Sequence, residues 1–411
     1  MNTLNIDLTK FITAETLSRH KIYGVSFDGI THKGIRLYDA VRLNWSPSNT
    51  SLLGYDDFKT RKPFKIKRCL MKPGSGGASC TINSYYDDLN LNFEQYNQKA
   101  KDEGLDRFIE YDCYYYARPN PWTWLISPDY IDGFYPCPAC DRGGKILSKW
   151  YMGEYMPNDE YRILDGCSPI TNMSNAEART ALRNKGYRLS DYANYNSVVM
   201  LALVKYADLD FQECVGMGGC GDPDYEVVCN GDKILSDDGE YDIYNFMDIE
   251  SIKVMGIVDF YGGAFKNCDA IFECGGYVYV NDDLDNITEW PTMDTWQTMG
   301  YKKSTSPLPN GGGDYNSTIC KLVYDSKFPW MTYPGKLGVG RYDVPELNLD
   351  VSSIRDRCMT NNDSTMRSVL LGGPWWDTVN LGPFTWDSTL DLLDKGVFAG
   401  CLATAFPVCH S

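Results

Sequence analysis

Residues 174–206 read "SNAEARTALRNKGYRLSDYANYNSVVMLALVKY", and this stretch carries the clearest structural pattern in the chain. Ser174 can cap a helix, and Glu177 stands three residues later, which is the spacing of a capping box. Apolar residues at helical spacing follow, and Gly186 is placed where a helix commonly ends. The sequence therefore predicts a helix that begins after Ser174 and ends at Gly186.

A second helix is predicted directly after the first. Ser190 can serve as its N-terminal cap. Apolar side chains then fall on one broad helical face, and these are Tyr195, Val198, Val199, Ala202, Leu203 and Tyr206. Two consecutive helices are therefore expected in the middle of the chain.

Short strands are predicted on both sides of this helix pair. Runs of β-branched and aromatic residues bounded by turn residues are typical of strands, and before the helices they occupy residues 21–29, 62–71 and 106–120. About 200 residues after the helices show almost no helical periodicity and are rich in glycine, proline and aromatic residues. Strands are expected there at 251–265 and 270–280, with a buried terminal strand at 396–406. The pattern predicts an α+β fold with short antiparallel strands and long loops.

Composition narrows the class of protein. The chain has 411 residues, 43% of them apolar, which suits a folded protein with a sizeable core. The net charge of −16 argues against nucleic acid or an anionic membrane as a partner. No apolar run reaches the roughly 18 residues of a spanning helix, so membrane insertion is not expected. The first residues also lack the pattern of a signal peptide.

The fifteen cysteines are numerous, and there are only three histidines. The single CxxC pair is Cys137 and Cys140, and no second pair follows at zinc-ribbon spacing. The sequence therefore favours free, mostly buried thiols and predicts no metal site and no cofactor. Pairing or metal binding stays open, above all for the loose cluster of Cys214, Cys220 and Cys229.

Six motifs in a fixed order resemble a known family. They are "YGVSFDG" (23–29), the block 114–140 that ends in "CPAC", "KWYMGEYM" (149–156), the helix pair with "DFQECVGMG" (166–218), "IKVMGIVDFYGGAFKNCDAIF" (252–272) and the segment 370–406. In this order they resemble the bacteriophage tail and receptor-binding proteins built on the C-type-lectin-like fold. Formylglycine-generating enzymes and the variable proteins of diversity-generating retroelements share that fold. The resemblance implies a C-type-lectin-like domain over 96–411, preceded by a small β-rich docking or oligomerisation region over 1–95.

The enzymes that share this fold need two nearby cysteines that bind copper just after a terminal Gly-Gly pair. Here Gly372-Gly373 is followed by no cysteine until Cys401. The next cysteine, Cys409, does not restore the enzymatic spacing. No nucleophile elbow, HExxH motif or dinucleotide fingerprint is present either. We therefore expect the chain to be no enzyme.

The segment "LLGGPWWDTVNLGPFTWDS" (370–388) concentrates aromatic residues among glycines, prolines and short polar residues. Rigid rings with adaptable polar neighbours are typical of recognition surfaces, and the resemblance implies such a surface on the carboxyl-terminal loops. The predicted receptor contacts are Trp375, Trp376, Asp377, Asn380, Phe384 and Trp386, extended by Trp290 and Trp296. The alternative is that some of these rings pack in the core or at a subunit interface.

The resemblance implies a virion protein, in a tail fibre, tail tip or head fibre, that is assembled in the host bacterial cytoplasm. Its expected partners are a host surface glycan or protein and other virion proteins. A homo-oligomer is expected, with a trimer favoured. The alternative function is a structural capsid, collar or tail decoration protein whose aromatic loops pack against neighbouring subunits.

Overall fold

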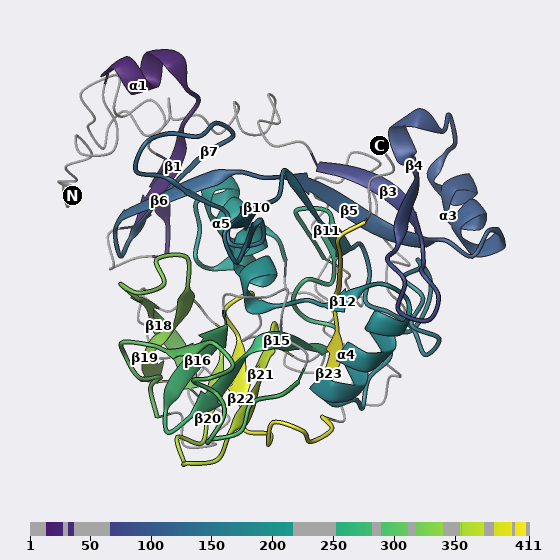
Figure 1. Cartoon of the computed structure of the whole chain (residues 1–411). Helices are drawn as coiled ribbons and strands as arrows, with labels where there is room; N and C mark the ends of the chain where they lie inside the picture. Colours follow the sequence, from purple (N-terminus) through teal and green to yellow (C-terminus); the bar gives the residue numbers. More distant parts are fainter. Residues whose placement is uncertain are drawn as a thin grey trace.

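The computed structural model describes residues 14–27, 32–36, 66–216, 252–281, 289–310, 317–339, 354, 356–373, 382–396 and 399–407. Short strands, joined mostly in antiparallel pairs, dominate these residues, and they surround one long central helix (Figure 1). The fold class is therefore α+β, mostly β, as the sequence predicts.

One sheet has six strands, in the order β12-β24-β11-β5-β3-β4. Its strands are β3 (Ile66–Lys72), β4 (Thr81–Tyr85), β5 (Asp106–Asp112), β11 (Lys149–Gly153), β12 (Arg188–Leu189) and β24 (Ala403–Ala405). The last strand inserts between β12 and β11 and is buried, as predicted. The single strand predicted over 396–406 is however divided into β23 (Ala399–Cys401) and β24, which belong to different sheets.

A second sheet has five strands, in the order β2-β1-β7-β6-β8. They are β1 (Tyr23–Phe27), β2 (Gly34–Arg36), β6 (Tyr115–Asn120), β7 (Thr123–Ser127) and β8 (Tyr135–Pro136). β1 pairs with β7, and β3 of the first sheet pairs with β5. Both sheets therefore cross the predicted boundary at residue 95, because backbone hydrogen bonds join strands from its two sides.

The third sheet has seven strands and contains most of the carboxyl-terminal strands. They are β15 (Phe265–Cys274), β16 (Tyr277–Asn281), β17 (Tyr301–Lys303), β20 (Cys358–Thr360), β21 (Arg367–Leu371), β22 (Trp386–Ser388) and β23 (Ala399–Cys401). Three two-stranded units complete the pattern: β9 (Asp141–Arg142) with β10 (Lys145–Ile146), β13 (Lys253–Val254) with β14 (Ile257–Val258), and β18 (Ser317–Tyr324) with β19 (Thr332–Val339).

The two predicted helices are present. α4 (Asn175–Asn184) has the predicted capping box between Ser174 and Glu177. α5 (Tyr192–Tyr206) is capped by Asp191 instead of the predicted Ser190. The Ser190 N–H donates to the Leu402 carbonyl (2.8 Å), which continues the extended chain of β12 and delays the helix by one residue.

Four further short helical segments were not predicted from the sequence. They are α1 (Ala14–Arg19), the 3-10 helix η2 (Tyr86–Asp88), α3 (Phe93–Asp102) and α6 (Phe211–Cys214). α3 has its own capping box, between Asn92 and Gln95. Among the described residues, none of the helices is both long and apolar enough to cross a membrane.

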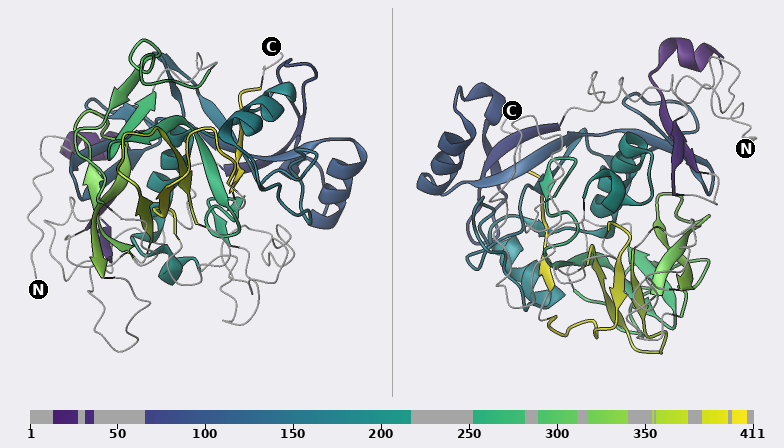
Figure 2. Two further views of the ribbon diagram at one scale, coloured as in Figure 1. Left: turned by 90° about the horizontal axis from the view of Figure 1, so that it is seen from below. Right: turned by 180° about the vertical axis from the view of Figure 1, so that it is seen from behind.

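Every residue of α5 is buried, including the face that the sequence leaves polar. The helix contacts β1 and β7 of the five-stranded sheet and β15 of the seven-stranded sheet. Figures 1 and 2 show it enclosed between the amino-terminal and carboxyl-terminal strands. Strands from both halves of the chain therefore pack against α5.

Candidate functional site

Two of the predicted contact residues lie in the core. Phe384 is 4% exposed and Trp386 is 1% exposed. The Trp386 ring meets the Tyr192 ring edge to face at 5.9 Å, and Phe384 meets Phe211 in the same way at 6.1 Å. The prediction is corrected for these two rings, because packing against α5 and α6 leaves them almost no surface to offer a receptor.

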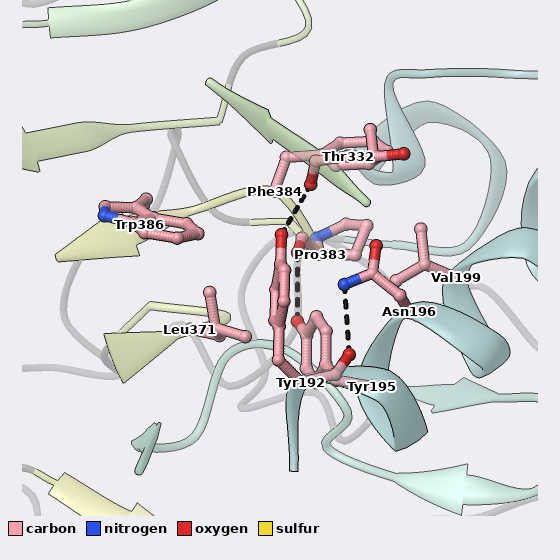
Figure 3. Close-up of a pocket in the computed structure, with 9 residues that line it drawn as sticks. All are labelled: Tyr192, Tyr195, Asn196, Val199, Thr332, Leu371, Pro383, Phe384 and Trp386. Carbon is pink, nitrogen blue, oxygen red and sulfur yellow. Dashed lines mark hydrogen bonds between the residues drawn. The ribbon is translucent and has the colours of Figure 1, made fainter. Parts of the chain in front are cut away.

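A small internal cavity lies beside these rings (Figure 3). Its volume of about 10 Å³ is room for about one water molecule, so it is a packing defect and not a ligand pocket. The Tyr192 hydroxyl donates to the Thr332 carbonyl (2.7 Å), and the Tyr195 hydroxyl donates to the Pro383 carbonyl (3.0 Å). The first of these hydrogen bonds attaches the start of β19 to α5, and the second attaches the segment around Pro383 to it.

The buried carboxyl group of Asp356 also binds the segment around Pro383. The Phe384 N–H donates to Oδ2 of Asp356 (2.6 Å). A Cβ on Gly382 would stand 2.1 Å from Oδ1 of Asp356, so only glycine fits this close approach. Burial raises the pKa of Asp356 well above its usual range, because the charged form would lose its hydration.

Trp290 and Trp296 are half-buried in a separate hydrophobic cluster with Tyr279. The guanidinium of Arg179 lies 3.9 Å from the centre of the Trp290 ring, and the Trp296 ring meets Tyr279 at 4.8 Å. The structure therefore does not bring these two rings together with Phe384 and Trp386. The other predicted contacts, Trp375, Trp376, Asp377 and Asn380, lie outside the described residues.

A cleft of about 460 Å³ lies elsewhere, and sequence reasoning missed it. It is lined by residues of the segment 135–144 and of the turn 327–330 after β18, which we call its two walls, and by Tyr116 of β6 and Ala193 of α5. Three aromatic rings and three prolines line it, namely Tyr116, Tyr135, Trp330, Pro136, Pro138 and Pro329. Its volume and its mixed lining of rings, prolines and polar groups fit a site for a small molecule or a short oligomer.

Each of the two more accessible rings of the cleft packs against another aromatic ring. Tyr135 is 58% exposed, and its ring lies 5.9 Å from that of the buried Tyr116. Trp330 is half-buried, and its ring lies 5.8 Å from that of Tyr192 on α5. The rings therefore combine open faces with fixed positions, which lowers the entropic cost of binding.

Arg118 anchors the turn that carries Trp330. Its guanidinium is buried and donates to the carbonyls of Pro121 (2.7 Å) and Met331 (2.9 Å). It also lies 4.2 Å from the Trp124 ring. Burial lowers the pKa of Arg118 to about 9. The group therefore acts as a structural hydrogen-bond donor that joins β6 to the start of β19.

The polar groups of the cleft stand at its exposed edge. Asp141 and Lys327 are both exposed, one on each wall. Gly143 and Gly144 form the tight turn between β9 and β10, with φ angles of 61° and 90°. The two glycines line the cleft with backbone alone, so no side chain from this turn fills the cleft. The cleft can therefore offer ring faces, one carboxylate and one ammonium group to a ligand.

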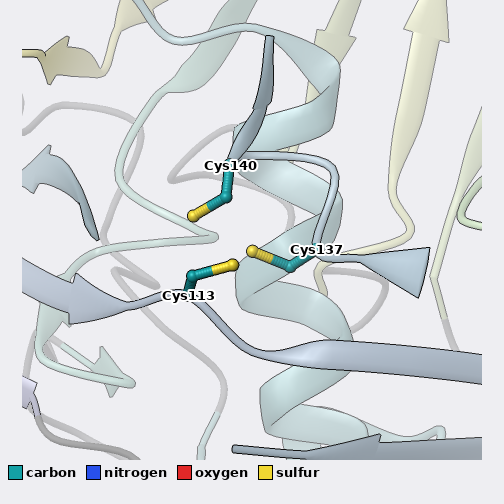
Figure 4. Close-up of side chains that lie close together, drawn as sticks. All are labelled: Cys113, Cys137 and Cys140. Atoms are coloured by element: carbon teal, nitrogen blue, oxygen red, sulfur yellow. The ribbon is translucent and has the colours of Figure 1, made fainter. Parts of the chain in front are cut away.

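Three cysteine side chains lie close together, two of them from the segment 135–144 and the third from the link between β5 and β6 (Figure 4). The Sγ atoms of Cys113, Cys137 and Cys140 all lie within 4.8 Å of one another. Hydrogen bonds from the thiols of Cys137 and Cys140 lower the pKa of Cys113 to about 4. Sequence reasoning found the CxxC pair but not Cys113, whose only local signal is a cysteine in the link between two strands.

The described cysteines are free thiols, and most are buried. Cys401 is fully buried in β23, which agrees with a packing role. Cys214 is partly buried, whereas Cys220, Cys229 and Cys409 lie outside the described residues. Within the part of the chain that the structure describes, only the cluster at Cys113 groups three potential metal ligands.

No family model matches the sequence, and no curated protein matches it. Among solved structures, the chain aligns with the Major Tropism Determinant U1 Variant at 10% identity and a TM-score of 0.29. The alignment covers 82% of this chain and 71% of the other. A TM-score this low does not assign the chain to that fold or to a family.

Proposed function

We propose that the chain is a non-enzymatic receptor-binding protein of a bacteriophage virion, built on a C-type-lectin-like fold. Its receptor would be a host surface saccharide held in the cleft between Tyr135 and Trp330. The observation that carries this proposal is the cleft itself, which is lined by an exposed ring, Tyr135, and a half-buried ring, Trp330. The order of the sequence motifs supports the phage family.

A saccharide suits these walls chemically. The C–H faces of sugar rings are apolar and stack on tyrosine and tryptophan, while their hydroxyls need donors and acceptors. The Asp141 carboxylate can accept such hydrogen bonds, and the Lys327 ammonium group can donate them. The cleft therefore matches both surfaces of a sugar.

Binding without hydrolysis fits the polar groups of the cleft. Glycosidases commonly need two carboxyl groups across the scissile bond. Among the described residues that line the cleft, Asp141 is the only carboxylate. This supports a binding protein and not a hydrolase. The trimer and the contacts with other virion proteins stay predictions.

The test is binding of the purified full chain to a panel of bacterial cells and to their extracted surface glycans. Tyr135→Ala removes an exposed ring of the cleft, and Tyr130→Ala is the matched control. Tyr130 is 61% exposed and does not line the cleft. We expect saturable binding that weakens at least about tenfold in Tyr135→Ala, about 1.4 kcal/mol, and is unchanged in Tyr130→Ala.

Three outcomes would contradict the proposal. Equal binding by Tyr135→Ala would move the site away from the cleft. Binding that survives removal of the glycans but not protease treatment of the cells would make the receptor a protein. No binding by the folded wild-type chain to any cell or glycan would favour the structural virion protein.

A further inference from the structure

The three clustered thiols come from two segments that the sheets bring together. Cys113 lies in the link between β5 and β6, whereas Cys137 and Cys140 follow β8. Cys137 and Cys140 are fully buried, and Cys113 is partly buried. We propose that these three cysteines bind one thiophilic divalent metal ion, of which zinc is the expected one, as three thiolates.

The sulfur positions suit such an ion. Zinc–thiolate bonds are about 2.3 Å long in a tetrahedral site, which places neighbouring sulfurs about 3.8 Å apart. The three Sγ atoms lie within 4.8 Å of one another, so their separations need to shorten by no more than about 1 Å to close the site. Soft thiolates select zinc over the hard cations magnesium and calcium.

The backbone around the cluster is already tied together. The Cys137 N–H donates to the Tyr114 carbonyl (2.7 Å), which joins the CxxC segment to the residue after Cys113. The Cys113 N–H donates to the Ser148 carbonyl (2.8 Å). The Leu147 N–H donates to the Cys140 carbonyl (2.9 Å), so the chain returns over the CxxC segment through the β9–β10 hairpin. The ligands are therefore placed before a metal arrives.

Side chains of α5 and of its N-terminal cap also bind the CxxC segment. The Ala139 N–H donates to Oγ of Ser197 (3.0 Å). The Arg142 guanidinium forms a buried ion pair with Asp191, the N-terminal cap of α5 (2.8 Å). These contacts fix the position of the CxxC segment relative to α5. They therefore limit how far the Sγ atoms of Cys137 and Cys140 can move away from that of Cys113.

The site offers three protein ligands and leaves a fourth position open. Among the described residues, no histidine, aspartate or glutamate joins the cluster. Because Cys113 is partly exposed, a water molecule can complete the tetrahedron from its side. The proposed coordination is therefore three sulfurs and one solvent oxygen.

The metal site would stabilise one wall of the cleft. Pro136, Pro138 and Asp141 line the cleft and alternate with the ligands Cys137 and Cys140 along the chain. A bound ion would hold this wall against the strand that carries Cys113. The site itself does not depend on the proposed function, since its residues and its test are separate from receptor binding.

The test begins with the full chain, produced with added zinc and purified without chelators. Elemental analysis should find about one zinc ion per chain. Cys113→Ser and Cys140→Ser should lose most of it. Cys167→Ser is the matched control, because Cys167 is a partly buried thiol outside the cluster, and it should keep the metal.

A second measurement covers the case in which a ligand variant does not fold. The wild-type chain, stripped and reloaded with Co²⁺, should show thiolate-to-cobalt charge-transfer bands and the visible bands of a tetrahedral ion. X-ray absorption of the zinc form should count three sulfurs. Four sulfurs would overturn the proposed ligand set.

Two results would overturn the proposal entirely. The first is wild-type protein that binds neither zinc nor cobalt under reducing conditions. The second is peptide mapping that finds a disulfide between Cys137 and Cys140 in protein purified with zinc present, since a disulfide sulfur is no longer a thiolate ligand.

Discussion

Two aromatic sets in this molecule have similar local sequences and opposite surroundings. Phe384 and Trp386 stand in "LGPFTW", and Tyr135 and Trp330 stand in "GFYPCP" and "FPWMTYP". The first pair is buried, whereas Tyr135 is 58% exposed and Trp330 half-buried. Trp386 belongs to β22, which has strands on both sides, whereas β8 with Tyr135 is an edge strand. For Trp386 and Tyr135, the position of the strand within its sheet, and not the local composition, separates a core ring from a surface ring.

The largest expected effect tests the buried set. Trp386→Ala removes a ring packed against Tyr192 and should lower the free energy of unfolding by about 3–5 kcal/mol. Urea denaturation followed by circular dichroism measures it. A loss below about 1 kcal/mol would show that the ring is not a core residue, and the contrast with Tyr135 would disappear.

A smaller effect is expected at the anchor of the cleft. Arg118→Met keeps the apolar stem but leaves the carbonyls of Pro121 and Met331 without this donor. The free energy of unfolding should fall by about 1–3 kcal/mol. Hydrogen exchange should also become faster at the backbone N–H groups of residues 330–332. Unchanged exchange there would mean that Arg118 does not hold the Trp330 wall.

The free energy of unfolding should also depend on pH, because of the buried carboxyl group of Asp356. Because the pKa of Asp356 is raised in the folded protein, folding takes up a proton that the unfolded chain releases above about pH 4. The free energy of unfolding should therefore fall as pH rises from about 4 to the raised pKa, by at most about 1.4 kcal/mol per pH unit from this group.

Asp356→Asn removes this titration and should flatten the profile of unfolding free energy against pH. The variant should then be more stable than the wild type at neutral pH. The exposed Asp159, changed to Asn, is the control. If both variants show the same profile as the wild type, the Asp356 carboxyl group does not stay protonated beneath Phe384.

The smallest effect on stability is expected at the exposed ring. Tyr135→Ala should change the free energy of unfolding by no more than about 0.5 kcal/mol, because little of the side chain is packed. Denaturation beside Trp386→Ala measures the difference directly. A large loss at Tyr135 would make both rings structural and would remove the basis for a binding cleft.

Structural features that depend only on residues close together in the sequence could be predicted. The capping box at Ser174 and Glu177 satisfies helix N–H groups locally, so α4 was found with its start in the right place. The same type of box at Asn92 and Gln95 was present in the sequence and could have revealed α3. The cap of α5 was misplaced by one residue because the Leu402 carbonyl, about 210 residues away, holds Ser190 extended.

By itself, the sequence determined the helix pair, the α+β class and the buried terminal strand, since caps and periodicity act within a few residues. Only the tertiary structure decided which rings are covered and which cysteines meet. The pairing of Tyr115 with Pro136 in β6 and β8, with the hydrogen bond from the Cys137 N–H to the Tyr114 carbonyl, places Cys113 beside the CxxC pair, although these residues are not neighbours in the sequence. Burial and ligand clusters depend on such long-range pairing, because a side chain's neighbours are set by the strands packed over it.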